Sequence, residues 1–97
     1  MYEIDHLISE TTYDGLSVQK LSKTESTETL LITLEKDCDF PEHTSPRDAL
    51  LVMMEGEIKF NIQNKQYKLS SWETFKFSAN ERHNVHSISS SKFLIIR

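Results

Sequence analysis

The stretch that decides the fold reads Ala49-Leu-Leu-Val-Met-Met-Glu-Gly-Glu-Ile-Lys-Phe-Asn-Ile62. Its second half alternates apolar and polar side chains, which is the pattern of a half-buried β-strand. Its first half, with Asp48, contains good helix formers and could also form two helical turns. We interpret this half as a strand because it is short and runs through Gly56 directly into the alternating strand.

Apolar runs separated by turns continue on both sides of this stretch. They lie at residues 16–19, 30–35, 75–77 and 93–96. Turn-forming residues separate the runs, from Asp14-Gly15 near the start to a serine cluster at 89–91. Short strands at such intervals are typical of an all-β sandwich or barrel. The sequence therefore predicts an all-β fold.

Length and composition exclude several classes of protein and of partner. The chain has 97 residues, enough for one domain but too few for two with separate cores. The formal net charge of −4, with no basic cluster, argues against nucleic acid or an anionic membrane as partner. The single cysteine, Cys38, excludes an internal disulfide and a cysteine-rich zinc module. No apolar run could span a bilayer and no signal peptide is recognisable, so we expect a cytoplasmic protein.

Two segments carry side chains suited to chemistry. The first, 41–49, contains His43, and the second, 80–86, contains His83. On a strand, His83 shares a face with Val85 and the opposite face carries His86. If Val85 packs inward, His83 also points inward. Two inward histidines would meet inside a barrel if their strands are neighbours.

These two segments resemble the sequence motifs of the cupins, a family of small jelly-roll β-barrels. The first cupin motif reads G-x5-H-x-H-x3,4-E-x6-G, and the second reads G-x5-P-x-G-x2-H-x3-N. Residues 37–56 align with the first motif and residues 72–87 with the second. His43, Gly56 and His83 match the motifs. The short spacer between the motifs is similar to that of single-domain bacterial cupins.

The resemblance implies a single cupin domain over residues 1–97. Its fold would be the RmlC-like jelly roll, also called the double-stranded β-helix. Residues 14–97 would form the barrel, and residues 1–13 would be an N-terminal segment.

The resemblance also implies a position for a metal site, which this chain only partly retains. Metal-binding cupins hold a divalent ion with three histidines and one glutamate, a set that suits Zn, Fe, Mn, Ni or Cu. His43 and His83 occupy two of the four positions, whereas Ser45 and Ala49 occupy the others. Two imidazoles are an incomplete shell unless a nearby carboxylate completes it. We therefore expect weak or no metal binding.

The favoured function is a barrel that binds a small, partly apolar molecule without catalysis. Histidine and serine side chains would fix the polar end of this ligand, and apolar side chains would line the cavity. The expected ligand-binding residues are His43, Ser45, His83, Leu51, Met53 and Val85.

Three other functions remain open. The main alternative is a metal-dependent cupin enzyme, of dioxygenase or isomerase type, with His43 and His83 as ligands. Ala49 at the glutamate position counts against it. A sensor or structural accessory protein is a further possibility, as is a metal-free enzyme with one of these histidines as general base.

Two runs are apolar on both faces, residues 49–54 and residues 93–96. A strand buried on both faces needs a cover on its outer face. The chain shows no convincing helix to supply that cover, and a second copy is the simplest alternative. The sequence therefore predicts a homodimer with the sheet that contains residues 50–54 at or near its interface.

Overall fold

The computed structural model describes all residues 1–97 and is almost entirely β-structure. Nine strands follow one turn of helix. The elements are α1 (Leu7–Glu10), β1 (Leu16–Lys23), β2 (Glu28–Leu34), β3 (Asp39–His43), β4 (Ala49–Glu55), β5 (Glu57–Ile62), β6 (Lys65–Ser70), β7 (Thr74–Phe77), β8 (His83–Ser87) and β9 (Ser91–Ile96). The all-β prediction is confirmed, and residues 49–55 form a strand. The single helical turn is neither long nor apolar enough to cross a membrane.

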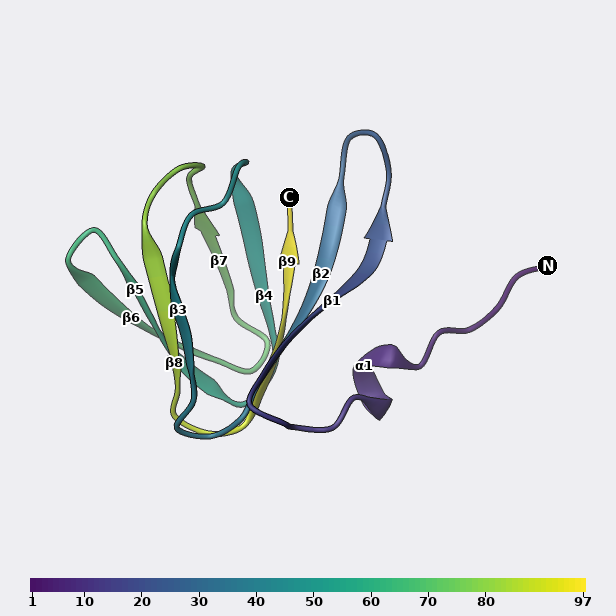
Figure 1. The fold of residues 1–97 in the computed structure, drawn as a ribbon, viewed down its shortest axis with the longest axis horizontal. Coiled ribbons are helices and arrows are strands. Elements are labelled where there is room, and N and C mark those ends of the chain that lie inside the picture. Colours follow the sequence, from purple (N-terminus) through teal and green to yellow (C-terminus); the bar gives the residue numbers. More distant parts are fainter.

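The strands form two antiparallel sheets that face each other (Figure 1). The five-stranded sheet has the order β1-β2-β9-β4-β7, and the four-stranded sheet has the order β3-β8-β5-β6. In Figure 1 the sheets converge at the bottom and diverge toward the top. We call these the closed end and the open end of the barrel.

Gly56 takes the chain from one sheet to the other at the closed end. Its φ of +89° lies in the region that favours glycine. A Cβ atom added there would lie 2.5 Å from the Ser90 carbonyl oxygen and 2.7 Å from the Ser91 Cα atom. Glycine at position 56 therefore allows the β4–β5 turn to touch the turn before β9.

The core lies between the sheets and follows the alternation of the strands. Leu51 and Met53 of β4 are fully buried, as are Ile58 and Phe60 of β5. They belong to a cluster of 13 buried apolar residues from both sheets. Period-two patterning thus assigned the inner face of these strands correctly.

The N-terminal segment covers part of the outer face of the five-stranded sheet. The Lys92 ammonium of β9 donates a hydrogen bond to the Ile8 carbonyl of α1. The Gln19 amide of β1 donates to the Thr11 hydroxyl at 3.2 Å. Lys92 is accordingly only 5% exposed. The sequence predicted that the chain itself could cover little of this face, and the N-terminal segment supplies the part of the cover that was not foreseen.

The rest of that outer face has no such cover. Leu50 and Val52 of β4 lie beside Ile96 and Leu94 of β9, respectively. All four side chains are half-buried, and none packs against the core. An apolar surface therefore remains on the outside of the barrel, near its middle strands.

Candidate functional site

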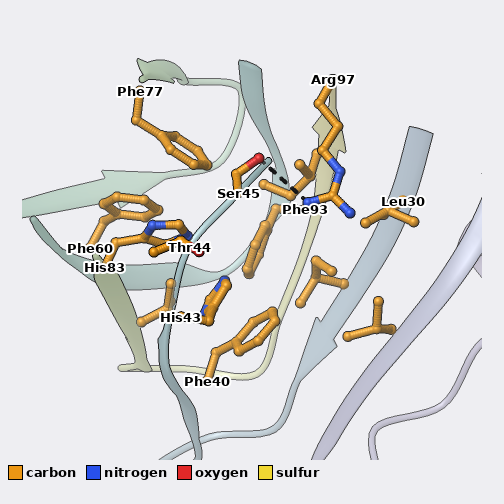
Figure 2. Close-up of a pocket in the computed structure, with 14 residues that line it drawn as sticks. Leu30, Phe40, His43, Thr44, Ser45, Phe60, Phe77, His83, Phe93 and Arg97 are labelled. Carbon is orange, nitrogen blue, oxygen red and sulfur yellow. Dashed lines mark hydrogen bonds between the residues drawn. The ribbon is translucent and has the colours of Figure 1, made fainter. Parts of the chain in front are cut away.

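A cavity of about 230 Å³ opens between the two sheets (Figure 2). Strands from both sheets contribute to its wall, and nine of its 14 lining residues are hydrophobic. The lining consists of Val18, Leu30, Ile32, Phe40, His43, Thr44, Ser45, Phe60, Phe77, His83, Val85, Phe93, Ile95 and Arg97. The cavity is therefore mostly apolar, with a small number of polar groups.

The two histidines of the motifs meet in this cavity. His43 ends β3 and pairs directly with His83, which begins β8. Their ring centroids are 4.2 Å apart, with the planes inclined at 65°. His83 is 3% exposed and shares its inward face with Val85, whereas His86 points outward and contacts Asp39 at 2.8 Å. The strand pattern predicted both orientations.

Backbone carbonyls define the tautomers of both rings. The His43 Nδ1 atom lies 2.6 Å from the Pro41 oxygen, and the His83 Nδ1 atom lies 2.9 Å from the Glu81 oxygen. A carbonyl oxygen can only accept a hydrogen bond, so we assign the proton to Nδ1 in each ring. In the neutral rings, each Nε2 atom then carries a lone pair. The site thus presents two hydrogen-bond acceptors of the same kind.

Burial keeps His83 neutral. Desolvation lowers its pKa below the usual 6.5, because a charged imidazole loses its hydration between the sheets. The hydrogen bond to the Glu81 carbonyl opposes this effect, and the nearby His43 adds to it. Near neutral pH, His83 is therefore an acceptor through Nε2.

The aromatic side chains of the wall hold the histidines in place. The Phe40 ring stacks on His43 with centroids 4.0 Å apart, and the Phe60 ring lies nearly parallel to His83 at 5.2 Å. Phe77 also contacts His83, at 4.7 Å. This packing restricts the motion of both imidazoles before any ligand enters.

A cationic group lies at the other side of the cavity (Figure 2). The Arg97 Nε and Nη2 atoms donate to Glu28 Oε1 at 3.1 and 3.0 Å. Its Nη1 atom donates to Ser45 Oγ at 3.4 Å. Lys20 also pairs with Glu28, at 3.5 Å, and hydrogen bonding from Arg97 holds the pKa of the Glu28 carboxyl below its usual value. Arg97 is thereby fixed at the cavity wall.

The structure places four of the six predicted ligand-binding residues in the cavity wall. The prediction that the other two line the cavity was wrong. His43, Ser45, His83 and Val85 line the cavity. Leu51 and Met53 face inward as expected, but they are fully buried in the core and do not line it. They pair with Ile95 and Phe93 of β9, which do line the cavity, but no residue of β4 reaches it.

Most residues of the cavity wall, including its charged residue, were not predicted from the sequence. Four phenylalanines that line the cavity were not singled out, and neither was Arg97. One signal could have identified Arg97: it follows Phe93 and Ile95 at a spacing of two, which places it on the same inner face.

The side chains do not assemble a complete metal site. No group of three or more histidine, cysteine, aspartate or glutamate side chains converges anywhere in the structure. Ser45 Oγ is engaged with the Arg47 carbonyl, to which it donates at 2.7 Å. The nearby Glu42 carboxylate pairs with Arg82 at 3.4 Å instead of turning toward the histidines. The donor set at this position therefore consists of two imidazoles, which does not fit a closed first-row metal centre.

No protein-family model matches the chain. No curated protein sequence matches it either. Solved structures, in contrast, resemble it over nearly its whole length.

An RmlC-like cupin protein from Desulfovibrio desulfuricans has a TM-score of 0.86 at 15% identity, covering 99% of this chain and 95% of that one. A cupin superfamily protein from Desulfitobacterium hafniense has a TM-score of 0.84 at 16% identity, with 99% and 90% covered. An RmlC-like cupin from Methanocaldococcus jannaschii, described as a double-stranded β-helix, has a TM-score of 0.78 at 20% identity, with 91% and 85% covered. At these identities the likeness concerns the fold. The chain has the cupin double-stranded β-helix fold, as its motifs predicted.

Proposed function

We propose that this cupin-fold barrel binds a small, mostly apolar molecule between its sheets, without catalysis. The observation that carries the proposal is an apolar cavity onto which two imidazoles with free Nε2 atoms converge. Ser45 adds a hydroxyl to the same wall. The volume of about 230 Å³ is below the ~300–1,000 Å³ typical of drug-sized ligands. The ligand is therefore a small one.

The hydrogen bonds of the two histidines support the binding role. A polar atom that faces a cavity without a protein partner can bind a ligand there. The Nδ1 atoms of His43 and His83 are paired with backbone carbonyls, but their Nε2 atoms have no protein partner. A ligand with an O–H or N–H group would supply the missing donor. Its apolar part would contact the phenylalanine side chains.

A direct test uses phenol as a small probe with one donor and anisole as its matched control without one. We expect phenol to raise the melting temperature more than anisole does, because ligands that bind the native state stabilise it. A His43→Gln/His83→Gln variant should lose this difference, whereas an outward His86→Gln variant should keep it. Equal effects of the two probes on the wild-type protein would contradict the role given to the histidines. No effect of either probe would contradict the binding function itself.

One observation favours the alternative of a metal-dependent cupin enzyme, of dioxygenase or isomerase type. Metal-ligating histidines usually donate their second ring N–H to a carbonyl or carboxylate, and both histidines here do so. His43 and His83 would then be the ligands of a Zn, Fe, Mn, Ni or Cu ion. With two side-chain ligands, we expect such binding to be weak.

Elemental analysis by plasma mass spectrometry separates the two functions. The untagged protein is measured before and after chelation, beside a His43→Ala/His83→Ala variant. The binding barrel predicts well below one metal ion per chain in both proteins. About one first-row ion per chain, lost in the variant, would favour the metal-dependent enzyme.

We also propose that the chain forms a homodimer through the outer face of its five-stranded sheet. Leu50, Val52, Leu94 and Ile96 form an uncharged, half-buried surface on its middle strands. The same surface on a second copy has the same chemistry, which suits a two-fold interface. The segment before α1 also leaves Tyr2 and Ile4 exposed, and it extends away from the barrel in Figure 1. A second copy would offer these side chains a cover.

Light scattering at micromolar concentration tests the dimer. We expect twice the chain mass for the wild type and a monomer for Val52→Asp/Leu94→Asp. A Gln66→Asp variant on the opposite sheet is the control and should remain dimeric. A wild-type monomer would remove this proposal without affecting the cavity.

A further inference from the structure

Arg97 is the one fully charged side chain in the wall of the cavity. Four other polar residues line it, and these are two histidines, a threonine and a serine. His83 is kept neutral by burial. The remaining lining is hydrophobic. A guanidinium in a largely apolar wall attracts an anion more strongly than it would in water, since the protein around it has a lower dielectric constant.

The hydrogen bonds of Arg97 leave part of its donor capacity free. A guanidinium carries five N–H groups in a planar fork. Two of them point to Glu28 and one points to Ser45. The remaining two have no protein acceptor, and the side chain is 23% exposed. The fork is thus held rigidly by Glu28 while two of its N–H groups remain available to a ligand.

The local charge balance also favours an anion. Lys20 and Arg97 both pair with Glu28, so two cations share one carboxylate and the group carries a net charge of +1. Glu28 and Lys20 do not line the cavity, whereas Arg97 does. A cationic ligand would meet Arg97 unfavourably, and a neutral acceptor would form weaker hydrogen bonds with its free N–H groups than an anion would.

We infer that the ligand is a small carboxylic acid in its anionic form, with its carboxylate at the two free N–H groups of Arg97. Its apolar or aromatic body lies among the phenylalanines, and a donor group at its far end meets the Nε2 atoms of His43 and His83. Figure 2 shows Arg97 and the two histidines on opposite sides of the cavity, with Ser45 between them. This inference rests on the proposed binding function and adds the charge of the ligand.

The test compares two probes of nearly equal shape, 4-hydroxybenzoate and 4-hydroxybenzamide, by titration calorimetry at pH 7.5. Both carry the hydroxyl for the histidines, and only the first is an anion. We expect 4-hydroxybenzoate to bind about tenfold more tightly or better, since hydrogen bonds to charged groups are the stronger ones. The preference should shrink at high salt, a measurement that needs no variant.

Variants of Arg97 test whether this residue causes the preference for the anionic probe. Arg97→Gln should bring the affinity ratio of the two probes close to one while the amide still binds. Arg97→Lys should keep part of the ratio, because it retains the charge but loses the planar fork. Arg82→Gln is the matched control, since it removes an exposed arginine that pairs with Glu42 outside the cavity, and it should leave the ratio unchanged. Circular dichroism shows whether each variant is folded.

The possible results distinguish a failure of the anionic-ligand inference from a failure of the proposed binding function. Equal or tighter binding of the amide by the wild-type protein would overturn the anionic ligand and leave the binding barrel intact. A ratio unchanged in Arg97→Gln would overturn the role of Arg97. If neither probe binds and phenol does not bind either, the binding function fails, and the inference fails with it.

Discussion

The two ends of the barrel both bury polar side chains, yet they use them differently. At the closed end, Ser87 and Ser91 are fully buried. The Ser87 hydroxyl lies 3.0 Å from the Leu34 carbonyl, and the Ser91 hydroxyl lies 3.2 Å from the Glu57 carbonyl. These contacts tie the turns of the closed end together.

At the open end, burial is almost as complete, but hydrogen bonding is not. His83 is 3% exposed and Ser45 is 2% exposed. His83 has a partner at Nδ1 and none at Nε2, and the cavity opens beside it. The comparison teaches that burial alone does not mark a binding site. A mostly buried polar side chain points to function when one of its atoms lacks a protein partner and faces a space that a ligand can fill.

The largest expected effect lies at the closed end, at Gly56. A Gly56→Ala substitution should lower the free energy of unfolding by about 3 kcal/mol or more, because a positive φ and contacts with Ser90 and Ser91 both oppose a Cβ atom. Urea denaturation measures the loss. Gly15→Ala is the matched control: its φ is also positive, at +63°, but no atom lies within 4 Å of the added Cβ. Equal losses in the two variants would mean that the close approach at Gly56 is not needed.

The next effect tests the serine contacts themselves. Ser87→Ala should cost about 1–3 kcal/mol, because it leaves buried acceptors such as the Leu34 carbonyl without this donor. The exposed Ser71→Ala change should stay within about 0.5 kcal/mol. Neither variant should alter the binding of phenol. A loss of phenol binding in a folded Ser87→Ala protein would contradict the view that the closed end stabilises the fold and only the open end binds the ligand.

A smaller effect at the open end appears as a dependence on pH. Since burial lowers the pKa of His83 in the folded state, the unfolded chain takes up the proton first as the pH falls below about 6.5. Stability should therefore decline from pH 7.5 toward the lowered pKa and then level off with respect to this group. Urea denaturation across this range should show a shallower decline for His83→Gln than for the wild type.

The exposed His6 serves as the control for that series. His6→Gln should follow the wild-type decline. If His83→Gln also follows it, the imidazole at the open end is not the group whose burial makes folding sensitive to pH.

The smallest effect is expected at a polar atom that has no partner and faces no cavity. The Thr33 hydroxyl is a buried side-chain atom without a hydrogen-bond partner. It does not line the cavity that contains the histidines. Thr33→Val should therefore leave stability unchanged or raise it by about 1 kcal/mol or less, because it removes an unpaired polar group at nearly constant shape. Denaturation beside the exposed Thr74→Val control measures it. A clear loss of stability would show that this hydroxyl has a partner in solution.

The cupin fold could be predicted well from the sequence. Alternation located the β-strand after Gly56 and its buried face, and the two histidines matched motifs that place them on neighbouring strands. The N-terminal helix was missed because residues 7–10 form only one turn, whose local signal is weak. Its position depends on contacts with Gln19 and Lys92, which lie far along the chain.

The candidate site could be predicted only in part. His43, Ser45, His83 and Val85 were identified because motif spacing and strand faces are local properties. Leu51 and Met53 were assigned to the cavity because alternation gives the inward face of a strand but not which of the inward-facing strands border the cavity.

The sequence by itself determined that the chain is all-β, which faces of its strands turn inward, and that two imidazoles share the interior. These properties follow from a period of two residues, which any strand imposes on its own side chains. Only the tertiary structure decided where the interior is filled and where it stays open. It also paired Arg97 with Glu28, 69 residues earlier in the chain. Such pairings depend on how the sheets converge, and that is a property of the whole chain and not of any single strand.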